Sequence, residues 1–311
     1  MKQVLIGKLI RDYRKEQKIN QEALCRGICE RSVLSKIENG QIMPDSLQAY
    51  TLFSRLGKDI PKNLIPITPS DRRKYNIISE IKRLHFIGDN RRIELLNDYK
   101  KNSRKWTNLD EQFYLLQKGL FISQYDDKLG EALQLFEKAL LLTFPEYSDS
   151  VNLSLYRFSE WELQILLQIA FANYYIYDLH KERNSLKEKA FSLIDFLKSY
   201  YEKFINNYEY KNLYSVILFQ YTNWLGLDKQ FEQAYKLSSD GIDISLKCNS
   251  LNYFSYHFFN KAYTEASLHD YKNAEKDFLF SLGLLKNMDD ANDIPMFIET
   301  IKREFNLEIK L

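Results

Sequence analysis

Polar side chains of the kind that contact nucleic acid recur on one side of a short segment near the start of the chain. Leu34 and Ile37, three residues apart, mark the inner side of a predicted helix. The helical spacing then leaves Glu30, Arg31, Ser32, Ser35 and Lys36 outward. Arg can bond a guanine edge with two hydrogen bonds, and Ser and Lys can bond bases or phosphates. Gln21 opens the preceding predicted helix, where a helix N-terminus can meet a phosphate. The candidate DNA-contacting residues are Gln21, Glu30, Arg31, Ser32, Ser35 and Lys36.

Two short helices joined by a tight turn would hold these side chains in place. Asn20 is a favourable N-cap for the first helix, and Gly27 can end it in a left-handed conformation. The second helix ends at Glu38-Asn39-Gly40, and Pro44-Asp45 precedes a further predicted helix. This pattern is typical of a helix-turn-helix that reads DNA. The alternative is a four-helix module used for protein contacts.

The segment from Gln21 to Gly40 resembles a known family. It reads Gln-x-x-Leu-Cys-x-Gly-Ile-Cys-x-x-Ser-x-Leu-Ser-Lys-Ile-Glu-Asn-Gly and is followed by Pro44. This run resembles the Xre/Cro-type helix-turn-helix and, with its shortened turn, the version in the PlcR, Rgg and NprR group of peptide-responsive, quorum-sensing regulators. The resemblance implies that Gln21, Arg31, Ser32, Ser35 and Lys36 lie at DNA.

Composition and charge favour an all-helical chain with a basic front end. The chain contains only 10 Gly and 6 Pro in 311 residues, and no strand-like alternation is evident. Residues 1–105 contain 23 Lys and Arg against 12 Asp and Glu, whereas residues 106–311 contain 21 against 30. Phosphate would attract the first part and repel the second. We therefore expect the front end to carry any contact with double-stranded DNA.

Other classes of function find little support. The 3 cysteines, Cys25, Cys29 and Cys248, lack His partners at zinc-finger spacing, so we expect no metal and no other cofactor. The four histidines are scattered, no Gly-rich phosphate loop occurs, and we expect no enzyme activity. No signal peptide and no apolar run near 18 residues are evident, so we expect a cytoplasmic protein without a membrane span.

A pattern of small and large residues repeats from about residue 110. The segment Ala132-x3-Phe136-x2-Ala139 has the spacing of the second helix of a tetratricopeptide repeat. Related patterns begin at Ala190, Ala234 and Ala274. Small residues let paired helices approach closely, and the large residue beside them fills the next gap. We predict degenerate repeats stacked in a right-handed superhelix with a concave surface. The alternative is an irregular helical bundle without a groove.

These observations predict an all-α protein in three parts. Residues 1–65 would form the helix-turn-helix domain, and residues 66–106 a linker with connecting helices, since Pro61, Pro66 and Pro69 interrupt the chain there. Residues 107–311 would form the TPR-like repeat domain, which binds a peptide and dimerises.

Carboxamides within apolar helix runs are the candidate ligand contacts, because Asn and Gln offer both a donor and an acceptor to a peptide backbone. The resemblance to PlcR implies that Asn173, Gln220 and Asn260 occupy peptide-contacting positions. For each of them, an interior amide bonded to a neighbouring helix is the alternative. Aromatic neighbours could form side-chain pockets, and the basic helices at 71–105 could supply cations for a carboxylate. The full set of candidates is Asn173, Gln220, Asn223, Asn260, Tyr175, Trp224, Tyr253, Lys82, Arg83, Arg91 and Arg92.

The function expected from these residues is DNA-binding transcriptional regulation controlled by a short signalling peptide. A single recognition helix reads few base pairs, so we expect a homodimer that presents two heads to an operator. Peptide bound in the groove would change the curvature of the repeats and the spacing of the heads. In the alternative, the repeats recruit a protein partner or serve only for dimerisation.

Overall fold

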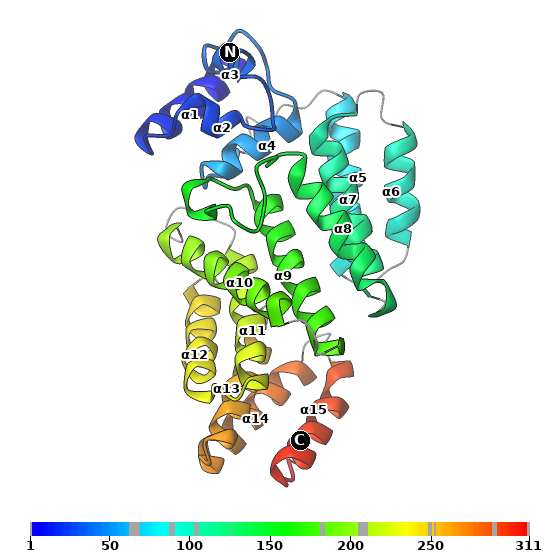
Figure 1. Cartoon of the computed structure of the whole chain (residues 1–311), viewed down its shortest axis with the longest axis vertical. Coiled ribbons are helices and arrows are strands. Elements are labelled where there is room, and N and C mark those ends of the chain that lie inside the picture. The colour runs from blue at the N-terminus through cyan, green and yellow to red at the C-terminus, as the bar shows by residue number, and fades with distance from the viewer. Residues whose placement is uncertain are drawn as a thin grey trace. The chain divides into compact units, whose positions relative to one another are not determined.

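The described residues of the computed structural model form helices and no strand (Figure 1). These residues are 2–61, 69–86, 91–102, 106–124, 126–180, 184–204, 211–247, 251, 253–287 and 291–309. The α-helices are α1 (Lys2–Glu16), α2 (Gln21–Cys25), α3 (Arg31–Glu38), α4 (Ser46–Arg55), α5 (Pro69–Phe86), α6 (Arg91–Asn102), α7 (Asn108–Ile122), α8 (Leu129–Leu141), α9 (Glu160–His180), α10 (Asn184–Phe204), α11 (Lys211–Leu227), α12 (Phe231–Lys247), α13 (Phe254–Ser267), α14 (Tyr271–Lys286) and α15 (Ile294–Phe305).

The helices group into two compact units. The N-terminal unit comprises Met1–Glu209 and the C-terminal unit comprises Tyr210–Leu311. The N-terminal unit therefore includes both the helix-turn-helix segment and the first repeat helices, α7 to α10. The division at residues 65 and 106 that we expected from the sequence stays a prediction. Pro66, Cys248 and the Gly88-Asp89-Asn90 helix break lie outside the described residues.

Helices α1 to α4, here called the head, enclose a small apolar core. Ile6, Ile10, Leu34, Ile37 and other apolar side chains from all four helices are fully buried in it. The predicted local signals set the helix ends. The Asn20 side chain accepts a hydrogen bond from the Ala23 amide at 2.7 Å, and Gly27 has a φ of +68°. Asp45 caps α4 in the same way, through the Gln48 amide at 2.8 Å.

Helices α5 and α6 pack on α7 rather than standing apart from the repeats. Ile81 of α5, Leu96 of α6 and Phe113 of α7 share one buried cluster. Asp110 joins the same helices, since Tyr99 donates a hydrogen bond to it and Lys74 forms an ion pair with it. Helices α5 and α6, which lie between the head and the repeat helices in the sequence, therefore belong to the core of the N-terminal unit.

Consecutive helices pair closely wherever a small residue was expected at the crossing. In the N-terminal unit, Ala132 and Ala190 are fully buried, and a Cβ added at Gly119 would lie 2.5 Å from the Phe136 ring. Only glycine therefore allows α7 to approach α8 so closely. Ala234 and Ala274 of the C-terminal unit are likewise fully buried. The close helix pairing predicted from these positions is confirmed, while the handedness of a superhelix stays a prediction.

Candidate functional site

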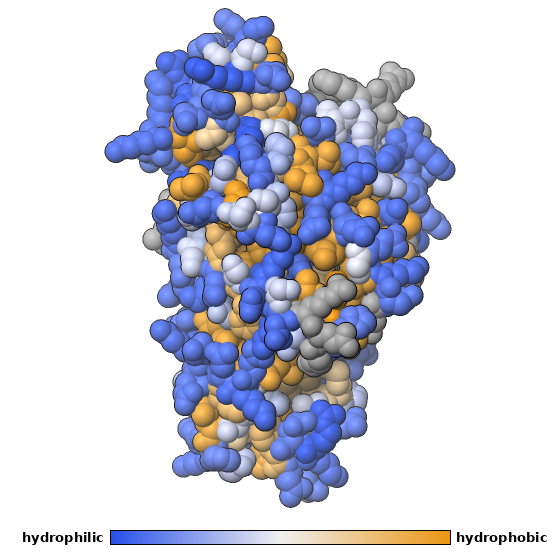
Figure 2. Space-filling view, in the orientation of Figure 1, coloured by the Kyte–Doolittle hydropathy of each residue, from blue (hydrophilic) through white to orange (hydrophobic). Residues whose placement is uncertain are grey.

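The outer face of α3 carries the polar side chains that sequence reasoning assigned to DNA. Glu30, Arg31, Ser32 and Lys36 are exposed and Ser35 is half-buried, while Leu34 and Ile37 on the opposite face are fully buried. In Figure 2, hydrophilic side chains cover most of the visible edge of the head, at the top of the view. The five polar residues are thus free of the head's own core and available to a ligand. Their contact with DNA bases stays a prediction.

An open groove of about 610 Å³ lies beside this face, between α1, α2 and α3. Arg31 and Ser35 of α3 line one side, Gln21 of α2 lines another, and Arg11 and Lys15 of α1 complete it. Four cations, Arg11, Arg14, Lys15 and Arg31, therefore border a groove large enough for a phosphate group. Arg11 and Lys15 were missed in the sequence, where they read as the solvated side of an amphipathic helix.

A buried carboxylate at the floor of this groove orients two of its residues. Arg14 donates to Glu38 twice, from Nε to Oε1 at 2.6 Å and from Nη2 to Oε2 at 2.8 Å. Gln21 Nε2 also donates to Glu38 Oε2, at 2.9 Å. The hydrogen bonds to Glu38 raise the pKa of Arg14, so the guanidinium stays charged. Glu38 holds the Gln21 amide nitrogen, which leaves the amide oxygen and the start of α2 to face the groove.

The candidate ligand contact of the N-terminal unit, Asn173, lies deep in α9. Its side chain is 1% exposed, and Nδ2 donates to the Ile169 carbonyl oxygen one turn earlier at 2.7 Å. Its Oδ1 is buried and has no hydrogen-bond partner among the described residues. A buried carbonyl oxygen without a donor costs about 1–3 kcal/mol, so this atom would gain from any donor that reached it. Tyr175, two residues on, is 42% exposed.

The C-terminal unit brings two further candidates into direct contact. Asn260 Nδ2 of α13 donates to Asn223 Oδ1 of α11 at 2.7 Å. The half-buried Asn223 and the nearly buried Asn260 therefore act as one carboxamide pair between two helices. Gln220 is also buried, one turn before Trp224, whose indole is fully buried.

Tyr253 belongs to an aromatic group in the same unit. Its ring centre lies 5.1 Å from that of Phe219 and 5.8 Å from that of Tyr256. Tyr253 also has a φ of +61° immediately before α13, a conformation that is uncommon for a residue with a side chain. The tyrosine thus stands at a fixed position at the entrance to α13.

The basic candidates of α5 and α6 do not form one cluster of outward cations. Arg83 is exposed and donates to both oxygens of Glu80, and Arg91 is exposed. Arg92, one of the cations that these helices were expected to supply to a ligand, is instead 2% exposed, with its guanidinium 5.5 Å from the centre of the Phe121 ring. Burial lowers the pKa of Arg92. The side chain of Lys82 lies outside the described residues.

No metal site and no membrane span emerge from the part of the chain that the structure describes. Its His, Cys, Asp and Glu side chains form no group of three or more that could hold a metal ion. None of its helices combines the length and the apolar character that crossing a membrane requires. Cys25 and Cys29 are free thiols.

Comparison with known proteins supports the reading of the head. The family described as helix-turn-helix matches residues 10–62, which cover the second half of α1 and all of α2 to α4. The chain therefore carries a helix-turn-helix DNA-binding domain at its N-terminal end. No curated protein sequence matches the chain.

Over 90% or more of its length, the chain is similar in fold to PlcR of Bacillus thuringiensis. The crystal structure of PlcR in complex with the peptide PapR7 and DNA has 19% identity and a TM-score of 0.53, covering 90% of this chain and 95% of that chain. The apo form of PlcR has 17% identity and a TM-score of 0.56, covering 94% and 99%. At this identity the similarity establishes the fold. It confirms the predicted all-α architecture, in which repeat helices follow an N-terminal helix-turn-helix, and the resemblance to PlcR at that level.

Proposed function

We propose that this chain is a transcription regulator that binds an operator as a homodimer and responds to a short peptide held by its repeat helices. The DNA contacts of the proposal are Gln21, Glu30, Arg31, Ser32, Ser35 and Lys36, joined by Arg11 and Lys15 of the groove. The peptide contacts are Asn173, Tyr175, Lys82, Arg83 and Arg91 in the N-terminal unit, and Gln220, Asn223, Trp224, Tyr253 and Asn260 in the C-terminal unit.

The buried, unpartnered oxygen of Asn173 is the observation that carries the peptide half of this proposal. Interior amides usually satisfy both of their polar atoms, and Asn173 Oδ1 lacks a donor within the described residues. A peptide backbone N–H is a donor of the required kind. The presence of a peptide and of DNA in the PlcR crystal structure supports the same reading by analogy of fold.

A titration tests the peptide half directly. The genes beside this one would be searched for a short secreted reading frame. A synthetic peptide from any frame found would be added to the full chain, and binding followed by calorimetry and by tryptophan fluorescence. We expect saturable binding that Asn173→Ala and Asn260→Ala each weaken, by about 1 kcal/mol or more for each hydrogen bond lost. Asn287→Ala, at the exposed C-cap of α14, is the matched control and should bind as the unchanged protein does.

Two results would contradict the peptide half of this proposal. Binding that is unaffected by both Asn substitutions would place the peptide elsewhere. No binding, together with DNA affinity that does not respond to the peptide, would favour the alternative in which the repeats recruit a protein or only dimerise. In that case sedimentation of the full chain still reports the homodimer.

A further inference from the structure

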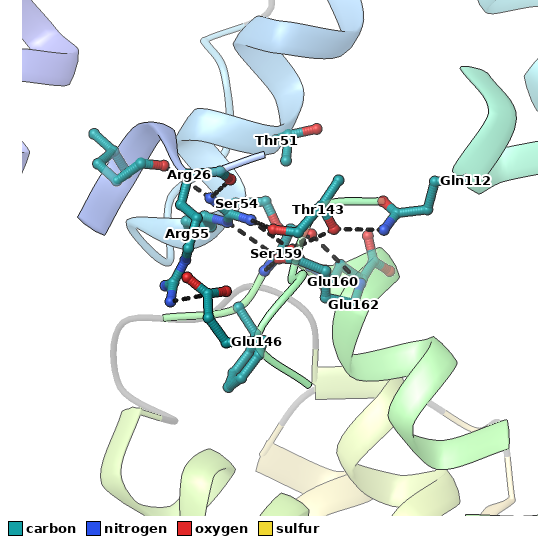
Figure 3. A network of polar contacts seen from close by, with 12 residues as sticks. Arg26, Thr51, Ser54, Arg55, Gln112, Thr143, Glu146, Ser159, Glu160 and Glu162 are labelled. Carbon is teal, nitrogen blue, oxygen red and sulfur yellow. Dashed lines mark hydrogen bonds and ion pairs between the residues drawn. The ribbon is translucent and has the colours of Figure 1, made fainter. Parts of the chain in front are cut away.

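A buried arginine joins the head to the repeat helices within the N-terminal unit. Arg55, the last residue of α4, is 1% exposed, and Glu162, in the first turn of α9, is fully buried. Arg55 donates to Glu162 from Nε at 3.1 Å and from Nη2 at 2.5 Å (Figure 3). Two parallel hydrogen bonds between planar groups fix an angle as well as a distance.

Every N–H of Arg55 has an acceptor, and the acceptors come from both sides. On the head side, Nη1 donates to the carbonyl oxygens of Leu24 at 3.0 Å and Arg26 at 2.6 Å. On the repeat side, Nη2 also donates to the carbonyl oxygen of Thr143 at 3.3 Å, besides the two bonds to Glu162. The guanidinium thus holds the end of α2, where the helix-turn-helix turn begins, and the start of α9 at once.

The carboxylate of Glu162 is itself fully engaged. It accepts hydrogen bonds from the Ser159 amide at 2.7 Å and from the Thr143 hydroxyl at 2.7 Å. Gln112 of α7 donates in turn to that hydroxyl at 2.6 Å. Burial by itself raises the pKa of Glu162, but the charge of Arg55 and these hydrogen bonds hold it below its usual value. Glu162 is therefore ionised where it faces the guanidinium of Arg55.

Neighbouring contacts close the same interface. The Glu160 amide donates to the Ser54 hydroxyl at 2.7 Å, and Arg26 lies 4.3 Å from the centre of the Tyr156 ring. A Cβ added at Gly27 would lie 2.4 Å from the Thr143 backbone, so the turn of the helix-turn-helix touches the segment after α8 directly.

A buried ion pair contributes little to the net free energy of folding, but it fixes the relative orientation of the two groups that it joins. Apolar residues of similar volume commonly stabilise such a site as well or better, whereas paired hydrogen bonds tolerate little rotation. We propose that Arg55 is a positioning residue for operator recognition, which through Glu162 fixes the orientation of the head on the repeat helices. This inference rests on the proposed function, because orientation matters only when two heads must reach two half-sites together.

The test compares Arg55→Met, Arg55→Lys and the double variant Arg55→Met with Glu162→Leu, all in the full chain. Nitroxide labels would replace the exposed Glu16 of α1 and Glu188 of α10, in a background without the native cysteines, and pulsed electron paramagnetic resonance would report their distance distribution. The operator would be selected from random duplexes. Affinity would then be measured for duplexes with two half-sites and with one. Lys198→Met, which removes a partly exposed ion pair with Glu202 of α10, is the matched control.

We expect a broader distance distribution in Arg55→Met and in the double variant, and an intermediate one in Arg55→Lys. Affinity for the duplex with two half-sites should fall roughly 10²-fold, because the advantage of linked sites is lost when geometry prevents joint binding. Affinity for one half-site should stay within about 2-fold, since a head that keeps its fold keeps its own contacts.

Two outcomes would overturn the inference. One is a distribution in the double variant as narrow as that of the unchanged protein. The other is a broad distribution with two-site affinity unaltered. Arg55→Met leaves the buried charge of Glu162 without its partner, whereas the double variant removes both charges. If Arg55→Met does not fold, the double variant therefore still provides the test. The distance is measured without DNA or peptide, so failure of the proposed function would leave this part of the test intact.

Discussion

The carboxylate of Glu38 holds the guanidinium of Arg14 from a position 24 residues further along the chain, with both oxygens engaged at 2.6 and 2.8 Å. Their side chains are 3% and 12% exposed. Glu38→Ala would leave Arg14 charged, partly buried and without this partner. We expect the free energy of unfolding to fall by about 3 kcal/mol, measured by urea denaturation.

The control for this prediction is Lys198→Met, which removes a more exposed pair and should cost less than about 1 kcal/mol. A loss from Glu38→Ala as small as that of the control would show that the Arg14 pair behaves as a surface pair. It would then have no structural role beneath the groove.

Arg31 offers a sharper test of the DNA-binding face. Arg31→Ala should weaken binding to a selected operator by about 1–3 kcal/mol while binding to unrelated duplexes changes much less. Lys36→Ala should weaken both and reduce the salt dependence of binding by about one unit of slope. Electrophoretic mobility shifts at several salt concentrations measure both effects. Lys302→Ala, on the exposed side of α15, is the control. An equal loss of operator affinity in Lys302→Ala and Arg31→Ala would show that α3 does not contact the operator.

Two glycines in the C-terminal unit should respond to alanine in opposite directions. A Cβ at Gly241 would lie 2.3 Å from the His257 ring, so Gly241→Ala should destabilise the protein by about 2 kcal/mol in spite of its better helix propensity. At Gly283 of α14, an added Cβ would meet no described atom within 4 Å apart from its chain neighbours and the nearby backbone of its own helix, and alanine should stabilise by about 0.5–1 kcal/mol. Thermal unfolding measures both, and a stabilising Gly241→Ala would contradict the close approach of α12 and α13.

His257 should make stability depend on pH. Burial lowers its pKa from 6.5 to about 4, although the hydrogen bond with Ser215 opposes that shift. The unfolded chain then binds a proton near pH 6.5 while the folded protein does not, so stability should decrease as pH falls from about 6.5 to about 4 and level off below. The loss is about 3 kcal/mol at most.

The matching measurement is urea denaturation at several pH values. His257→Gln should remove this component of the pH dependence, whereas His180→Gln, at the exposed end of α9, should retain it. A pH profile that is the same in His257→Gln and in the unchanged protein would mean that His257 titrates normally.

Local rules explain why much of the fold was predictable. Asn20 and Asp45 cap their helices through the amide three residues on, and Ala132 and Ala274 mark close crossings by size alone. Such features depend on neighbours in sequence. The side chains of α3 were predictable for the same reason, because helical spacing fixes which ones face outward.

Contacts between distant segments were not predictable. Arg55 reads as an ordinary cation at the end of a helix, and its partner Glu162 lies 107 residues away. Arg92 was misplaced because its neighbours in α6 are charged, whereas an aromatic ring of α7, Phe121, covers it. The pairing of Asn223 with Asn260 likewise required the packing of α11 against α13.

Helix α9 has 21 residues. Glu162, in its first turn, contacts the head, and Asn173 lies about 16 Å further along the helix axis. A single continuous helix therefore contacts the DNA-binding head near its start and carries a candidate peptide contact further along. If DNA and peptide both shift the position of this helix, the two binding events are linked. DNA must then change the affinity for the peptide by the same factor by which the peptide changes the affinity for DNA. At the same peptide concentration, a cell with many free operator copies would then have a different fraction of its regulator bound to peptide from a cell with one copy.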